Sequence, residues 1–188
     1  LTNCDDLEAL AEEAWDWHSG VDVWINNAGA DILTGEALFW PFERRLDALW
    51  KVDVASTVQL GRIIGRRMKL VGKGTILNTG WDGAERGMAG DGAQLFALAK
   101  GAIMAFTRSL AQSLAPEVRV NCIAPGWIKT AWGDDADQRW QQRAVDESLL
   151  GRWGVPADVA RAALFLVSPA AAFINGQIVE VNGGFRRS

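Results

Sequence analysis

Short apolar runs alternate with longer segments of helical periodicity along the chain. Four runs are short, apolar and mostly β-branched, as is typical of buried strands: 21–25, 75–78, 119–123 and 177–181. The longer segments predict helices: one that ends at Ser19-Gly20, one over 42–70 with a break near Val52, and others over 93–114, 134–148 and 156–166. This alternation predicts an α/β fold with a parallel sheet and helices on both faces.

Each predicted strand is followed by a loop that contains Gly, Pro or Asn. The loops are residues 26–30, 79–92, 124–132 and 182–184. The carboxyl ends of parallel strands meet at one edge of a sheet, where α/β proteins bind ligands. Gly and Pro often do no more than mark turns, but four such loops at one edge favour a binding site.

Composition narrows the classes of partner. The 188 residues suit one domain, and a net charge of −4 gives no indication of nucleic acid or an anionic membrane as partner. No apolar stretch approaches the roughly 20 residues that a membrane span requires. Cys4 and Cys122 have neither CxxC nor metal-ligand spacing, so we expect a reduced, cytoplasmic protein without a metal site.

Five motifs carry a resemblance to a known family. They are VDVWINNAG (21–29), AKGAIMAFTRSLAQSLAP (99–116), VRVNCIAPGWIKT (118–130), GRWGVPADVA (151–160) and INGQIVEVNGG (174–184). In this order and spacing the chain resembles the short-chain dehydrogenase/reductase family. The resemblance implies that residues 1–188 form a single, partial domain with a Rossmann-type, doubly wound parallel sheet. It also implies NAD or NADP as cofactor and hydride transfer between an alcohol and a ketone.

The Gly-rich turn that begins the family's cofactor site has no counterpart in residues 1–188. Such a turn seats the pyrophosphate on a helix N-terminus. Counting backward, the N-terminal strands that are missing from this chain amount to about two βαβ-like units, on the order of 60 residues. We therefore expect residues 1–188 alone to bind a dinucleotide poorly and to expose apolar sheet edges. The functional protein is expected to contain the missing segment, which also carries the choice between NAD and NADP.

The resemblance assigns cofactor contacts residue by residue. Asn26, Ala28 and Gly29 match positions near the adenosine side. The positions that would line the nicotinamide are Pro125, Gly126, Ile128 and Thr130. Lys100 matches the lysine that reaches the nicotinamide ribose and whose charge lowers the pKa of the family's acid.

The catalytic positions depart from the family pattern. Phe96 occupies the position of the tyrosine that exchanges the proton, and it lacks the hydroxyl. Asp53 matches the asparagine of the proton relay. The serine position falls on Trp81 when it is counted from the strand, and on Asp82 or Gly83 when it is counted back from Phe96. Of the four catalytic positions, Lys100 alone is kept.

Three hypotheses follow from these replacements. The first is a noncatalytic or weakly active member of the family. The second is an oxidoreductase with altered chemistry, in which Asp82 becomes the acid because burial against Trp81 favours its protonated form; Asp82 also suits a plain turn. Asp53 is a weaker candidate, since an ion pair with Lys100 would account for it without any role as an acid.

The third hypothesis is a structural subunit. In the family, the helices that match 93–114 and its predecessor pack against the same helices of another copy. The small residues of 93–114 allow two such helices to approach closely. We therefore expect a homo-oligomer, either a dimer or a tetramer. Core packing within one chain explains the same small residues. We expect a small-molecule substrate. The segment 131–150, at the family's substrate-lid position, mixes tryptophans and charged residues and does not indicate one class of ligand.

Overall fold

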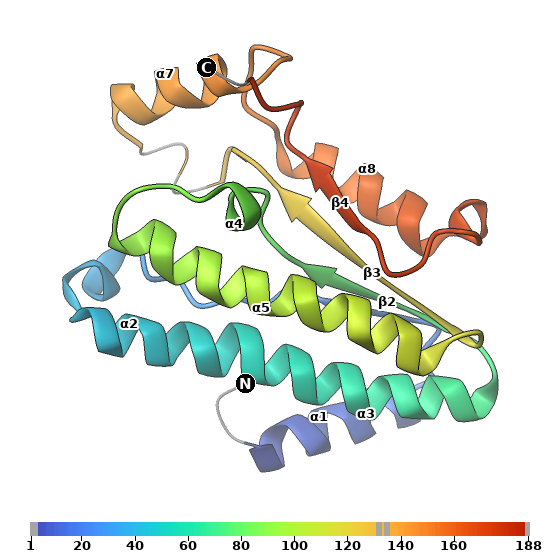
Figure 1. Ribbon diagram of the computed structural model, residues 1–188. Coiled ribbons are helices and arrows are strands. Elements are labelled where there is room, and N and C mark those ends of the chain that lie inside the picture. The colour runs from blue at the N-terminus through green and yellow to red at the C-terminus, as the bar shows by residue number, and fades with distance from the viewer. Residues whose placement is uncertain (1–3, 131–132, 134–135, 187–188) are drawn as a thin grey trace.

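The computed structural model describes residues 4–130, 133 and 136–186, which form a four-stranded parallel sheet with helices on both faces (Figure 1). The strands are adjacent in chain order: β1 (Val23–Asn26), β2 (Gly74–Thr79), β3 (Val118–Pro125) and β4 (Ile178–Val181). The α-helices are α1 (Cys4–Asp16), α2 (Phe42–Leu49), α3 (Ser56–Val71), α4 (Gly83–Arg86), α5 (Asp91–Leu114), α7 (Gln138–Glu147) and α8 (Pro156–Val167). A π-helix, η2 (Trp50–Ala55), joins α2 to α3, and two short 3-10 helices are η1 (Gly35–Phe39) and η3 (Pro169–Ala171). The predicted α/β class is confirmed.

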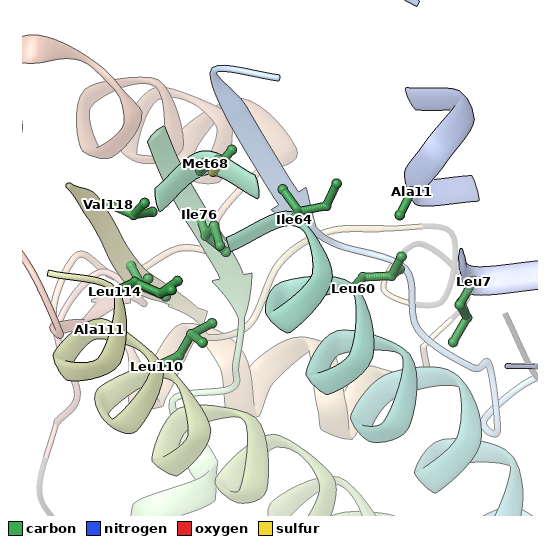
Figure 2. Close-up of a cluster of buried hydrophobic side chains, with 11 residues drawn as sticks. Leu7, Ala11, Leu60, Ile64, Met68, Ile76, Leu110, Ala111, Leu114 and Val118 are labelled. Carbon is green, nitrogen blue, oxygen red and sulfur yellow. The ribbon is translucent and has the colours of Figure 1, made fainter. Parts of the chain in front are cut away.

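The two faces of the sheet have separate cores because successive strand residues point to opposite sides. Ile76 of β2 lies in a cluster with side chains of α1, α3 and α5, several of which Figure 2 shows. The next residue, Leu77, packs on the other face with Ile123 of β3 and Leu166 of α8. Ile76 is 0% exposed, so shortening it to alanine is expected to cost about 2–5 kcal/mol of stability.

The connection between β3 and β4 differs from the others. Helices α3 and α5 lie on the same face and connect β1 to β2 and β2 to β3. The sheet then continues in the same direction to β4, but α8 lies on the opposite face. The β3–α8–β4 crossover therefore has the opposite hand to the two before it, a departure from the usual uniform handedness. Its long connection includes α7, which lies beyond the carboxyl end of β3 (Figure 1).

The predicted elements agree with the structure apart from their ends. All four predicted strands are present and shift by one or two residues at their boundaries. The predicted break near Val52 is confirmed, because the helix changes to a π-helix over 50–55. The polar helix predicted over 134–148 is described from Gln138 to Glu147, and its predicted start at 134–135 lies outside the described residues. The short helices η1, α4 and η3 were not predicted.

β1 lies at an edge of the sheet and exposes apolar side chains on one face. In the described residues β1 pairs only with β2. Val23 is 38% exposed and Ile25 is 48% exposed, and both point to the face opposite α3. The strand at this edge therefore exposes apolar surface, as the sequence predicts.

Candidate functional site

A cavity of about 1240 Å³ opens at the carboxyl edge of the sheet. Its lining comes from the loops after β1, β2 and β3, the first turns of α5, and one side of α8. The predicted site residues that line it are Phe96, Lys100, Pro125, Gly126, Ile128 and Thr130. The loop 182–184 instead contacts the β2–α5 loop through Asn182. Three of the four loops singled out from the sequence therefore meet around one space.

Phe96 and Lys100 lie one turn apart on α5 and both line the cavity. Phe96 is partly buried and packs on a cluster that includes Ile32, Leu49 and Leu95. This packing fixes the ring beside Lys100. The position therefore presents an aromatic surface to the cavity and has no group that could exchange a proton.

The Lys100 ammonium is held by a buried carboxylate. Its Nζ lies 2.8 Å from Asp53 Oδ2, and the side chains are 11% and 1% exposed. The other oxygen, Asp53 Oδ1, accepts the N–H of Ala30 at 2.8 Å. Asp53 comes from η2, so this one side chain joins the π-helix, the loop after β1 and α5. The ion pair proposed for Asp53 in the sequence is thus formed, and it compensates the charge of Lys100 within the cavity wall.

The residues assigned to the adenosine side lie apart from the cavity lining. Asn26 turns into the α3 side of the sheet, where its Oδ1 accepts from Trp24 Nε1 and its Nδ2 donates to Asn78, each at 2.8 Å. Ala28 is exposed, and a Cβ built on Gly29 would lie only 3.1 Å from Asp53 Oδ2. Asn27, which sequence reasoning missed, is the residue of this loop that lines the cavity.

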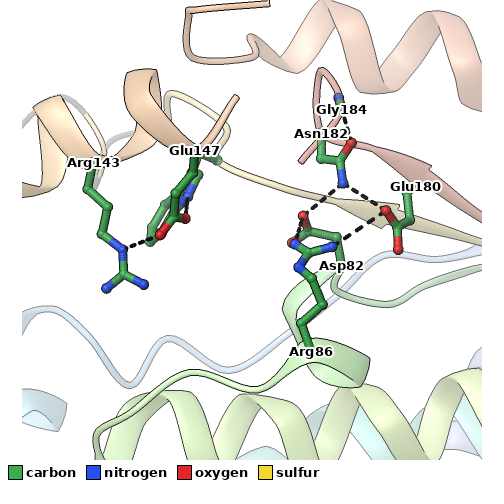
Figure 3. A network of polar contacts seen from close by, with 8 residues as sticks. Asp82, Arg86, Arg143, Glu147, Glu180, Asn182 and Gly184 are labelled. Carbon is green, nitrogen blue, oxygen red and sulfur yellow. Dashed lines mark hydrogen bonds and ion pairs between the residues drawn. The ribbon is translucent and has the colours of Figure 1, made fainter. Parts of the chain in front are cut away.

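Asp82 is the centre of a polar network that joins two loops (Figure 3). The carboxylate is buried, pairs with Arg86, and accepts Asn182 Nδ2 at 3.0 Å. Asn182 Nδ2 also donates to Glu180 Oε2 at 2.8 Å. In its contacts with Arg86 and Asn182 the Asp82 carboxylate is the acceptor. It thereby ties the β2–α5 loop to the end of β4.

The serine position is filled by an indole. Trp81 lines the cavity directly after β2. A Cβ on the neighbouring Gly83 would overlap the Trp81 ring, so glycine is the residue that lets the indole lie there. Neither of the other two positions considered for the serine, Asp82 and Gly83, lines the cavity.

Three indoles form a cluster between the β3 loop and α7. The ring centroid of Trp127 lies 5.5 Å from that of Trp140 and 5.9 Å from that of Trp153. Trp127 Nε1 donates to Glu147 at 2.8 Å. Glu147 also accepts Arg143 Nε at 2.6 Å, and Figure 3 shows this pair. Trp127 and Trp140 line the cavity, so α7 supplies one wall of the site from the segment predicted as a lid. Residues 131–132 and 134–135 of that segment lie outside the described residues.

Arg45 of α2 is a second lining residue that sequence reasoning missed. Its side chain is 13% exposed, and its nearest ionic partner is Asp91 Oδ2 at 3.5 Å. Its position in the polar first turns of a helix gave no signal, because an arginine there usually points to solvent.

Two searches of the described residues bear on other classes of function. None of the described helices is both long and apolar enough to cross a membrane. Within the same part of the chain, no group of three or more His, Cys, Asp or Glu residues is placed to hold a metal ion.

Residues 1–186 match the family model described as enoyl-(acyl carrier protein) reductase. The 3-oxoacyl-[acyl-carrier-protein] reductase FabG of Vibrio cholerae is 32% identical over 185 residues, which cover 98% of this chain and 74% of that protein. Nodulation protein G of Rhizobium meliloti is also 32% identical, over 187 residues, with the same coverage of 98% and 74%.

Solved structures show the same fold. A 7α-hydroxysteroid dehydrogenase complexed with NADH and 7-oxo glycochenodeoxycholic acid superposes with a TM-score of 0.86 at 31% identity, covering 100% of this chain and 72% of that one. The gluconate 5-dehydrogenase of Burkholderia cenocepacia in complex with NADP and tartrate gives a TM-score of 0.83 at 26% identity, with coverage of 97% and 71%.

Proposed function

Because the chain belongs to the short-chain dehydrogenase/reductase family, we propose that it is an NAD(P)-linked oxidoreductase whose ordinary alcohol–ketone chemistry is weak. The observation that carries the proposal is the pairing of Phe96 with Lys100 on one cavity wall, with the Lys100 ammonium 2.8 Å from Asp53. The site keeps the family's lysine and replaces the groups that move the proton. Loss of a general acid typically lowers a rate by about 10²–10⁴.

The residues present fit the nicotinamide end of a dinucleotide. Pro125 ends β3, and Gly126, Ile128 and Thr130 follow it. All four line the cavity, where they offer peptide groups and one hydroxyl. A bound nicotinamide would supply or accept a hydride there. We infer that NAD or NADP is the cofactor and that residues 1–188 alone bind it weakly, since they contain no Gly-rich turn for the pyrophosphate.

The protein's own groups would orient rather than protonate a substrate. Lys100 is held in place by Asp53, and Phe96 offers a flat apolar surface beside it. Trp81 excludes water from the position of the family's serine. Asp82 belongs to the proposal only as an alternative acid, and for that role it would have to leave Arg86 and Asn182.

A noncatalytic, cofactor-binding or structural protein is the second candidate function. The observation that favours it is that Asp82, the best substitute acid, is bound by Arg86 and Asn182 and does not line the cavity. We further propose that the protein is cytoplasmic and assembles as a homo-oligomer. The outer face of α5 supports assembly, because Leu98 is 49% exposed and a Cβ on Gly101 would meet nothing within 4 Å.

Tryptophan fluorescence tests the proposal. Trp81, Trp127 and Trp140 line the cavity, so a bound nicotinamide should quench them saturably on titration with NADH or NADPH. Saturable quenching with slow turnover on a panel of ketones would support a weak oxidoreductase. Saturable quenching without any turnover would favour the noncatalytic candidate. No quenching with either nucleotide, even at concentrations high enough to detect weak binding, would refute both cofactor-using functions.

A further inference from the structure

The cavity carries positive charge from two side chains. In the part of the chain that the structure describes, the charged residues that line it are Arg45 and Lys100, and both are cations. Lys100 is neutralised by Asp53 at 2.8 Å. Arg45 faces Asp91 at 3.5 Å, and the Asp91 side chain is 64% exposed, so this pair contributes little because solvent screens it. Arg45 is thus the cation of the lining whose charge remains available to a ligand.

The guanidinium of Arg45 reaches the cavity through its terminal nitrogens. Its Nε is buried and has no hydrogen-bond partner among the described residues, so it is closed to a ligand in the cavity, and the Nη groups are the donors that a ligand can use. The planar fork of arginine donates two parallel hydrogen bonds to a carboxylate, which is the pairing that its geometry matches best.

We propose that Arg45 binds the carboxylate of the substrate, and that the substrate is a monocarboxylic acid with an apolar body and a carbonyl or hydroxyl at its far end. The proposal rests on the proposed function, because it names the substrate class of that same site. One cation whose only printed ionic partner is exposed to solvent matches one negative charge. Much of the remaining cavity lining is apolar, as at Leu33 and Leu38, or lacks a side chain, as at Gly92.

The helix α5 sets a lower limit on the length of this substrate. Asp91, which lies beside the guanidinium, and Phe96, which marks the reacting end, are five residues apart on α5. They are therefore about 7.5 Å apart along the helix axis and about 140° apart around it. Because the rotation adds to the axial separation, the carboxylate and the carbonyl must be at least about five or six carbon–carbon bonds apart. Gly92 lies between the two points, and a Cβ there would meet Leu33 at 3.4 Å, so glycine keeps the path narrow but open.

A pair of probes that differ only in charge tests the proposal. Ligand-observed NMR titrations without nucleotide would compare 6-oxoheptanoate with its methyl ester on the purified protein. We expect the acid to bind about ten- to a hundredfold more tightly than the ester, the range given by hydrogen bonds to a charged group. Equal affinities for the acid and the ester would overturn the proposal, and this comparison requires no variant.

Variants on the same helix turn identify the residue. Arg45→Met should weaken binding of the acid about ten- to a hundredfold and leave the ester unchanged, and Arg45→Lys should lie between Arg45→Met and the native protein. Arg44→Met is the matched control, because Arg44 is exposed and stacks on the Trp40 ring at 4.0 Å. Undiminished binding of the acid by folded Arg45→Met would refute the assignment.

The two proposals can fail separately. If NADH does not quench the tryptophans while the acid still binds, the proposed function alone is refuted. If NADH quenches them but the acid binds no better than the ester, this inference alone is refuted.

Discussion

Replacing Asp53 by alanine should destabilise the protein strongly, because it would leave the Lys100 ammonium buried without a counter-charge. The Asp53 and Lys100 side chains are 1% and 11% exposed, and their charged atoms are 2.8 Å apart. Removing one partner of such a buried pair costs about 3–5 kcal/mol. The N–H of Ala30 would lose its acceptor as well. For a chain of this length the loss corresponds to a fall in Tm of about 6–20 °C.

Urea denaturation followed by circular dichroism would measure the loss, and a double-mutant cycle would show its origin. Asp53→Asn keeps an acceptor for Ala30 and removes the charge, so it should cost less than Asp53→Ala. The double variant Asp53→Ala/Lys100→Met should be more stable than the sum of its single variants predicts, because neither charge is then left alone. Strict additivity, or a loss under about 1 kcal/mol for Asp53→Ala, would refute a buried ion pair that contributes to stability.

Three further predictions concern other positions. Phe96→Tyr, alone or with Asp53→Asn, should raise the rate of NADPH-dependent ketone reduction by a factor of up to about 10²–10⁴. Phe96→Leu is the control. An unchanged rate in Phe96→Tyr and in Phe96→Tyr/Asp53→Asn would show that the remaining geometry does not support the family's chemistry. Asp82→Asn should lower the free energy of unfolding, measured by urea denaturation, by about 1–3 kcal/mol, because a buried network loses its charge. It should leave any residual turnover unchanged. Loss of turnover in a variant that remains folded would assign Asp82 as the acid. Burial raises the pKa of the Cys122 thiol to about 12. A mildly alkaline pH lies below this pKa, so the thiol of the folded protein stays protonated and should resist alkylation until urea unfolds the chain. Peptide mass spectrometry would locate the label, and modification of Cys122 in the native protein would contradict its burial.

Periodicity predicted the sheet and the main helices because each buried strand and helix face leaves a local pattern. The break near Val52 was visible for the same reason, since the helical phase changes where η2 begins. The short helices η1, α4 and η3 run for only three to five residues each. Helices of that length show no full period, so a pattern cannot predict them.

The candidate site was predicted where motifs carry it and missed where tertiary contacts make it. Phe96 and Lys100 could be placed together because they are one turn apart on a helix. The sequence left two interpretations of Asp53 open, a substitute acid or an ion-pair partner of Lys100. Only the packing of η2 against α5, which brings the two side chains together, distinguishes them. Arg45 could not be found, because its place in the cavity wall depends on elements far apart in the sequence, such as the start of α5 that carries its partner Asp91.

The indole cluster between the β3 loop and α7 gives the protein an internal spectroscopic reporter. Indoles whose centroids lie 5.5 and 5.9 Å apart couple their excited states, so Trp127, Trp140 and Trp153 should give a far-ultraviolet dichroic couplet that isolated tryptophans lack. The coupling falls steeply with separation and depends on the angle between the rings. A displacement of α7 relative to the β3 loop would therefore change the couplet, and the position of this wall of the cavity can be followed in solution without an added dye.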